Sequence, residues 1–122
     1  MTTPAEDLAG YLTRYPEELA FGTEDPEAVL DRYHTPDLEY CNDGTVLSRD
    51  ALLAHVRPVR KRATAVRVDV HEAVVTGDRV AARYTLTATM RKGGELATEI
   101  YMFGRLAADG RISRIDQLTR IP

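Results

Sequence analysis

Residues 37–44 read DLEYCNDG and residues 48–52 read SRDAL, and these two neighbouring segments decide the fold. The first segment predicts a short strand that turns at its Asp-Gly pair, and the second predicts the start of a helix. Side chains two positions apart share one face of a strand, so Tyr40 and Asn42 are expected to point the same way. A phenol and a carboxamide that enter one cavity can hold a polar group of an otherwise apolar ligand.

The chain before this segment predicts two helices. The first has a stripe of apolar residues with a period of 3.6, Thr3 as a plausible cap and Pro4 in its first turn. Pro16 is expected to end or kink it. The second begins at Asp25-Pro26, a cap followed by a proline, and ends before Pro36, because the residue before a proline avoids helical angles.

The chain after this segment changes its period. A third helix, capped by Ser48, has Leu52, His55, Val56 and Val59 on one face. After Arg62 the apolar residues alternate with a period of 2, which predicts a strand around residues 66–70 and further strands at 80–90, 96–107 and 112–121. Helices followed by long antiparallel strands predict an α+β fold. In it the N-terminal helices pack in a curved antiparallel or mixed sheet, which forms a cone with a central pocket.

Composition limits the class of protein. The chain has 122 residues, of which 43% are hydrophobic and 29% charged, so we expect one domain over residues 1–122. It has no apolar run of about 18 residues, which argues against a membrane partner. The first residues lack the features of a signal peptide and Cys41 is the only cysteine, so we expect a cytoplasmic protein.

The net charge of −3 argues against nucleic acid as a partner. Residues 57–62 read RPVRKR, but a basic run at the end of a helix is usually a solvated surface, and no aromatic residues interrupt this one. We therefore expect no nucleic-acid binding.

The order of these elements resembles the SnoaL-like, nuclear transport factor 2-like superfamily. The resemblance runs from about Leu8 to Arg120, and its motifs are DPEA at 25–28, LEY at 38–40, SRDAL at 48–52 and DGRISRI at 109–115. It implies a cone-shaped domain that binds a small hydrophobic ligand. The superfamily includes ketosteroid isomerases, limonene-type epoxide hydrolases, polyketide cyclases, dehydratases and members without catalysis, so the fold leaves the function open.

Within that superfamily the limonene-type epoxide hydrolases have the most similar site residues. Their pocket holds a Tyr-x-Asn pair, which Tyr40 and Asn42 match, an Arg-x-Asp pair and an Asp on the last strand. Counting from the Asp-Gly turn at 109–110, with one extra residue allowed there, places Arg83 at the arginine. Thr85 and Gln117 then stand where the two aspartates are expected, and neither can act as a general acid or base.

The other comparisons within the superfamily are also incomplete. Asp116 is expected on the face opposite to Gln117, and neither Met90, Met102 nor Gln117 supplies the base that a ketosteroid isomerase or a SnoaL-type cyclase needs. The resemblance therefore implies a site of hydrogen-bonding groups in apolar surroundings. The expected catalytic residues are Tyr40, Asn42, His55 and Arg83, and the expected substrate-binding residues are Thr85, Leu86, Ile100, Met102, Ile115 and Gln117.

Several of these residues have a second interpretation. Tyr40 and Asn42 either line the pocket or pack and cap the edge of the sheet, and Arg83 either reaches the cavity or lies in solvent. His55 is either a proton-transfer group or a histidine at the rim of the core. The three histidines lack ligand spacing, so no metal is expected, and no cofactor is expected.

Two classes of function stay open. The first is a cofactor-free enzyme, such as a cyclase, isomerase, dehydratase or epoxide-hydrolase-like protein, that acts on a polyketide- or terpenoid-like substrate. The second is a non-catalytic ligand-binding or accessory protein. For either, an aromatic and charged strand face with Tyr101, Phe103 and Arg105 predicts a homodimer through the convex side of the sheet.

Overall fold

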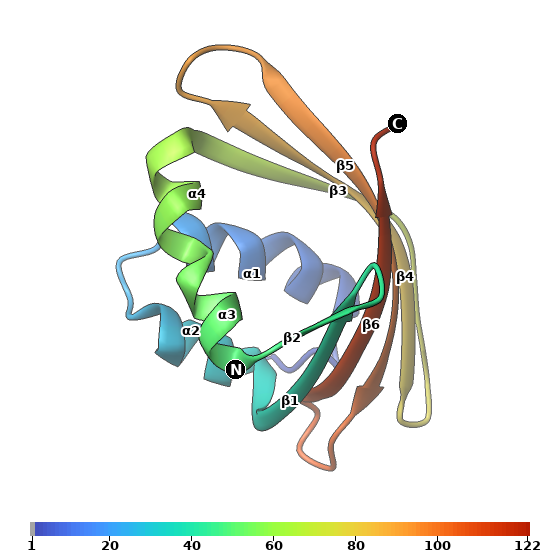
Figure 1. The fold of residues 1–122 in the computed structure, drawn as a ribbon. Coiled ribbons are helices and arrows are strands. Elements are labelled where there is room, and N and C mark those ends of the chain that lie inside the picture. Colours follow the sequence, from blue (N-terminus) through green and yellow to red (C-terminus); the bar gives the residue numbers. More distant parts are fainter. Residues whose placement is uncertain (1) are drawn as a thin grey trace.

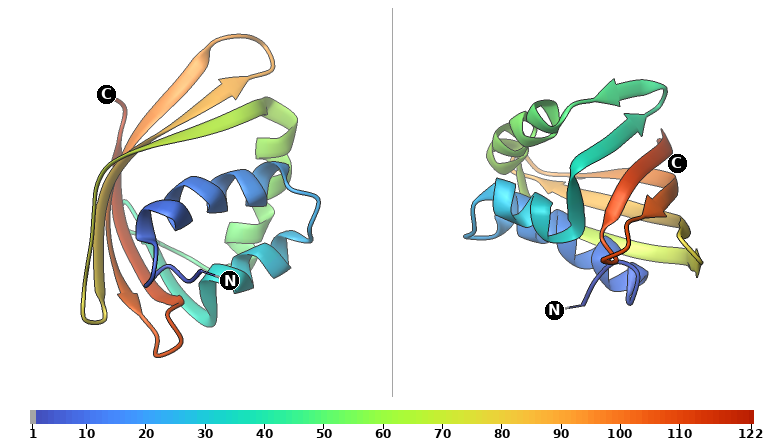
Figure 2. Two further views of the ribbon diagram at one scale, coloured as in Figure 1. Left: turned by 180° about the vertical axis from the view of Figure 1, so that it is seen from behind. Right: turned by 90° about the horizontal axis from the view of Figure 1, so that it is seen from below.

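The structure is a computed structural model that describes residues 2–122, and its architecture is α+β. Helices lie inside the curve of a strongly bent sheet (Figure 1). Figure 2 shows from two other sides that they occupy the concave face. The helices are α1 (Leu8–Phe21), α2 (Pro26–Tyr33), α3 (Arg49–Ala54) and α4 (Val56–Arg62). The strands are β1 (His34–Asn42), β2 (Thr45–Leu47), β3 (Ala63–Thr76), β4 (Arg79–Met90), β5 (Glu95–Leu106) and β6 (Ile112–Arg120).

The sheet has the strand order β2-β1-β6-β5-β4-β3. Strands β3 to β6 form the predicted antiparallel meander, and β1 joins its edge beside β6, as predicted. The pairing of β1 with β6 is parallel, so the sheet is mixed. The short strand β2 pairs with Tyr40, Cys41 and Asn42, so this part of β1 is not a free edge.

The turn between β1 and β2 confirms the Asp-Gly prediction. Asn42 pairs with Thr45, and the two residues between them have positive φ angles, 51° at Asp43 and 81° at Gly44. Positive φ at both central residues is typical of a type I′ hairpin turn, for which Asp-Gly is a favoured pair. The turn sends the chain back along β1 and towards α3.

The first helix begins later than predicted. Its N-cap is Asp7, whose Oδ1 accepts a hydrogen bond of 2.9 Å from the backbone N–H of Gly10. Thr3 instead caps a separate turn, since its hydroxyl oxygen accepts a 3.3 Å bond from the N–H of Glu6. The helix continues through Pro16 to Phe21, so of the two predicted effects of Pro16, an end or a kink, the end is wrong. This helix has 14 residues. Within residues 2–122, no helix has the length and hydropathy needed to cross a membrane.

The predicted third helix is divided at His55 into α3 and α4. Pro58 has no backbone N–H and cannot donate to the carbonyl of Ala54, which explains the break. Arginines hold both halves in place. Arg49 donates to the two carboxylate oxygens of Asp31 on α2 at 2.6 and 3.0 Å, and Arg60 donates to the carbonyl of Ala20 on α1 at 2.8 Å.

The hydrophobic core lies between α1, α2 and the concave face of the sheet. Val29 and Ile112 are fully buried at its centre, and Met102 is 2% exposed. The predicted cap of α2 is confirmed, because the Asp25 carboxylate accepts a 3.1 Å bond from the N–H of Glu27. This core fills one end of the cone, and the other end holds a cavity.

Candidate active site

A cavity of about 560 Å³ lies between the helices and the concave face of the sheet. One wall comes from α1, a second from α3 and α4, and the third from the sheet strands. The side chains that line it are mostly apolar, and they include aliphatic residues of every wall. The polar and aromatic members of the lining are Tyr11, Tyr15, Phe21, Tyr40, Asn42, His55, Tyr84, Thr98, Gln117 and Thr119.

Strand alternation decides which side chains enter the cavity. On β6 the inward positions are Ile115, Gln117 and Thr119, so Asp116 lies on the other face. Met102 of β5 pairs with Gln117, and Gln117 pairs with Asn42 of β1. These three residues therefore form one row across the floor of the cavity.

Most of the predicted site residues lie together in this cavity. Tyr40, Asn42 and His55 of the predicted catalytic set line it, and the predicted binding residues that do so are Leu86, Ile100, Met102, Ile115 and Gln117. Their placement supports a common site. Their roles in catalysis stay predictions.

Arg83 and Thr85 lie outside the cavity, so the expected binding position of Thr85 was wrong, and of the two interpretations of Arg83 the one outside the cavity holds. Tyr84, Leu86 and Ala88 are the β4 residues that line the cavity, so the residues between them point outward. The Arg83 guanidinium lies 3.9 Å from the carboxylate of Glu72, and the Thr85 hydroxyl is hydrogen-bonded to the His71 ring at 2.8 Å. The count from the Asp-Gly turn allowed one extra residue, and an error of one residue inverts the face of a strand.

A pair of carboxamides forms part of the cavity floor. Gln117 is 8% exposed, and its Nε2 donates a hydrogen bond of 3.0 Å to Oδ1 of Asn42. The pair links β1 to β6 and keeps two polar side chains satisfied in apolar surroundings. The remaining amide donors and acceptors of the pair are available to a ligand.

Tyr15 and Tyr84 are the main cavity residues that the sequence analysis did not identify, and they join the predicted Tyr40. Tyr15 of α1, Tyr40 of β1 and Tyr84 of β4 all line the cavity. Burial and the proximity of the other phenols raise the pKa of Tyr15 and of Tyr84 well above the usual value, and burial raises the pKa of Tyr40 to about 12. All three hydroxyls therefore remain protonated near neutral pH and can donate hydrogen bonds.

The sequence pattern around Tyr15 and Tyr84 is compatible both with core packing and with a cavity wall. Tyr15 belongs to the apolar stripe of the first helix, and such a stripe usually marks core packing. Tyr84 is separated from Leu86 by one residue, so the correct strand face would have found it. Tyr11 lies beside Tyr15 with ring centroids 5.5 Å apart and completes the aromatic wall.

Titratable groups in the cavity are few. Among residues 2–122, no Asp, Glu, Lys or Arg lines it. His55, which lies exposed between α3 and α4 at the edge of the cavity, is the one lining histidine of the described chain. Histidine is the side chain that exchanges a proton most readily near neutral pH. In the same range, 2–122, no three His, Cys, Asp or Glu side chains are grouped to hold a metal ion.

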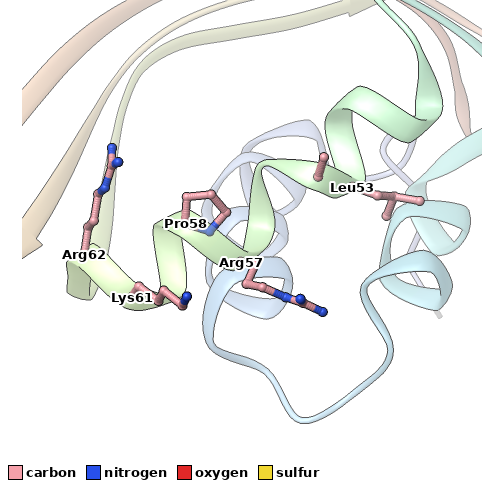
Figure 3. Close-up of a pocket in the computed structure, with 6 residues that line it drawn as sticks. Leu53, Arg57, Pro58, Lys61 and Arg62 are labelled. Atoms are coloured by element: carbon pink, nitrogen blue, oxygen red, sulfur yellow. The ribbon is translucent and has the colours of Figure 1, made fainter.

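A second hollow lies on the outer side of α3 and α4 and is shown in Figure 3. Leu53 and Pro58 form its apolar part, and Arg57, Lys61 and Arg62 its charged part. In Figure 3 the side chains of Arg57 and Lys61 extend in a similar direction and that of Arg62 extends in another, and all three are exposed. This arrangement is that of a solvated helix surface, as the sequence predicted, and the candidate active site is the cavity inside the cone.

The comparisons with known proteins agree with this geometry. The model of the SnoaL-like domain family matches residues 12–115. AclR from Streptomyces galilaeus, described as a candidate hydroxylase, superposes with a TM-score of 0.73 at 18% identity over 95% of this chain and 90% of that chain. IdmH from Streptomyces antibioticus, described as a candidate polyketide cyclase, gives 0.70 at 20% identity over 95% and 91%.

A further structural relative was solved with a bound small molecule. A protein from Catenulispora acidiphila with a ketosteroid isomerase-like fold, solved in complex with trimethylamine, superposes with a TM-score of 0.66 at 15% identity over 95% of this chain and 85% of that chain. At such identities the likeness shows the fold. No curated protein matches the sequence.

Proposed function

Because this chain belongs to the SnoaL-like domain family, we propose that it is a cofactor-free enzyme acting on an apolar, carbonyl-bearing substrate of polyketide or terpenoid type. The proposed reaction is a proton transfer that leads to cyclisation, isomerisation or dehydration. One observation carries the proposal: a strip of neutral hydrogen-bonding groups crosses an otherwise apolar cavity. The description of IdmH as a candidate polyketide cyclase supports the substrate class.

The hydrogen-bonding strip would bind and polarise a carbonyl oxygen. Tyr40 donates from a phenol that stays protonated, since burial raises its pKa to about 12. The Asn42 amide is held in place by Gln117 at 3.0 Å. Fixed donors aimed at an oxygen that gains negative charge stabilise the enolate-like transition state, because they need no reorganisation during the reaction.

His55 would move the proton. As a neutral imidazole it removes a proton from the carbon beside the polarised carbonyl, and the C–H electron pair becomes the double bond of an enolate. In a cyclisation the enolate carbon then attacks a second carbonyl carbon of the same substrate, and the new alkoxide takes the proton back from the imidazolium. The exposed position of His55 also allows exchange with solvent.

The second candidate is a non-catalytic ligand-binding protein on the same fold. It is favoured by one observation, that no carboxylate lines the cavity within residues 2–122. Gln117 stands where the epoxide hydrolases place their last-strand aspartate, and the cavity-facing residues of β4 supply no acid. Hydrolysis of epoxides by a pair of carboxylates is therefore not part of the proposal.

Binding and turnover of polycyclic ketones, measured separately, would test the proposal. In the Tyr40→Phe variant we expect turnover to fall about 100-fold, with affinity changed much less, because one donor is lost from a dry site. The matched control is Tyr101→Phe, which removes the same hydroxyl from the opposite face of the sheet. A wild type that binds ketones without converting them favours the second candidate, and one that does not bind them contradicts both.

We also propose a homodimer that forms through the convex sheet face. Phe103 and Leu118 are 69% and 63% exposed there, and Tyr101 pairs with Leu118 on adjacent strands. An exposed apolar patch with a charged margin, here including Arg105, is typical of a protein interface. The proposed location is the cytoplasm, which the lone free cysteine, Cys41, supports.

A further inference from the structure

The tip of the β1–β2 hairpin is tied to the rim of the cavity by one carboxylate. Asp43 accepts a hydrogen bond of 2.7 Å at Oδ1 from the backbone N–H of Thr119, and its Oδ2 accepts a second bond from the Thr119 hydroxyl. The N–H of Asp43 donates to the carbonyl of Gln117 at 3.0 Å, which fixes the turn against β6. Thr119 lines the cavity, whereas Asp43 lies outside it.

The direction of the hydrogen bond between Asp43 and Thr119 is settled by chemistry. An ionised carboxylate can only accept, and a threonine hydroxyl has a single hydrogen to donate. The hydrogen of Thr119 is therefore committed to Asp43. The Thr119 oxygen keeps its lone pairs, so a ligand group that reaches it meets an acceptor.

We propose that Thr119 is a specificity-determining residue that accepts a hydrogen bond from a hydroxyl group of the ligand. Asp43 is a positioning residue that acts through Thr119. The inference rests on the proposed function, because it requires a ligand in this cavity. It narrows the ligand class to apolar molecules that carry an alcohol, phenol or enol.

The neighbourhood of Thr119 supports this class. Tyr40, Asn42, Gln117 and Thr119 form one polar strip along the ladder of β1 and β6, in which Asn42 pairs with Gln117. Burial and, to a smaller extent, the negative charge of Asp43 raise the pKa of Tyr40, so its phenol stays protonated and can donate. A ligand with a carbonyl and a hydroxyl group would thus meet donors and an acceptor on the same strip.

The Asp43→Asn variant should reverse the polarity of Thr119. The backbone N–H of Thr119 can only donate, so it must face the Asn oxygen, and this orients the Asn NH₂ group towards the Thr119 hydroxyl oxygen. The hydroxyl hydrogen is then released and can turn into the cavity. Thr119 changes from an acceptor into a donor while its position and size stay the same.

The test compares 2-naphthol, which can donate a hydrogen bond, with 2-methoxynaphthalene, which can only accept one. Dissociation constants are measured by calorimetry at pH 7 for the wild type and the Asp43→Asn variant. We expect the wild type to prefer 2-naphthol by about threefold to tenfold, as one hydrogen bond allows, and the variant to lose or invert this preference. The matched control is Asp109→Asn, which changes the other Asp-Gly turn and should keep the wild-type ratio.

Two further variants guard against a change in folding. Thr119→Val removes the acceptor and should abolish the preference, while Thr119→Ser keeps the hydroxyl and should restore it. An unchanged preference in both Asp43→Asn and Thr119→Val overturns this inference but leaves the proposed function intact, since both probes still bind. A wild type that binds neither probe contradicts the proposed apolar cavity and the role of Thr119 together.

Discussion

The hydroxyl of Tyr11 donates a hydrogen bond of 2.7 Å to Nε2 of His34 in the core of the protein. The other ring nitrogen, Nδ1, lies 2.8 Å from the carbonyl oxygen of Leu30, which can only accept. His34 is therefore a neutral imidazole with its hydrogen on Nδ1. It is 1% exposed, and this burial lowers its pKa to about 4, so the pair is an uncharged link between α1 and β1.

This link predicts that stability depends on pH in the acid range. In the unfolded chain His34 takes up a proton near its ordinary pKa of about 6.5, but in the folded chain only near 4. The unfolded state binds more protons between these values, so the free energy of unfolding should fall as the pH drops from about 6.5 to about 4. The loss should be about 3 kcal/mol. Urea unfolding at a series of pH values measures it.

Two variants separate His34 from the other titrating groups. His34→Gln removes the buried imidazole and should flatten the pH dependence in this window, although the protein will be less stable throughout. His55→Gln removes an exposed imidazole and should keep the wild-type slope. Equal slopes in both variants would assign the effect to other residues.

His55 is predicted to affect turnover but not stability. It lies exposed at the edge of the cavity, so His55→Gln should leave the thermal midpoint within about 2 °C, as is typical of surface substitutions. Loss of the proton-transfer group should lower the rate about 100-fold or more. His71→Gln, on the outer face beside Thr85, is the control and should retain the rate. If His55→Gln turns over normally, the proton is moved by another group.

Met102 is predicted to contribute both to the stability of the fold and to the shape of the cavity. It is 2% exposed and also lines the cavity floor, so Met102→Ala removes packed atoms that solvent does not replace. Such truncations destabilise by about 2–5 kcal/mol. Met90→Ala at the less buried end of β4 should cost clearly less. Chemical unfolding of the two variants gives the comparison, and equal losses would show that Met102 is not a core residue.

Phe103 is predicted to lie at the centre of the dimer interface. Phe103→Glu would place an unpaired charge there and should raise the dimer dissociation constant by about 100-fold or more. Leu96→Glu is the matched control, because Leu96 is 51% exposed on the same strand but belongs to the opposite face. Sedimentation measures both. A monomeric wild type, or a Phe103→Glu variant that still dimerises fully, would refute the interface.

The sequence by itself determined the elements of the fold and one face of the last strand. The Asp-Gly pair at 43–44 requires a hairpin that accepts positive φ angles, and the change of period after Arg62 separates helices from strands. On β6, a short count forward from Gly110 against the family pattern, together with alternation, favoured Gln117 inward and Asp116 outward, and the structure has this arrangement. These are local properties, because each depends on residues within a few positions of one another.

The tertiary structure alone decided which distant residues share the cavity. The orientation of Arg83 and Thr85 depended on a count across two strands and a turn, where one extra residue inverts the face. Tyr15, Tyr40 and Tyr84 converge from α1, β1 and β4, and no local pattern distinguishes such convergence from core packing. The bond from Thr119 to Asp43 joins residues 76 positions apart, and it exists because β6 pairs in parallel with β1. The chemistry of each side chain is a local property. Whether a hydroxyl such as that of Thr119 donates to a ligand or accepts from it depends on partners that only the folded chain brings together.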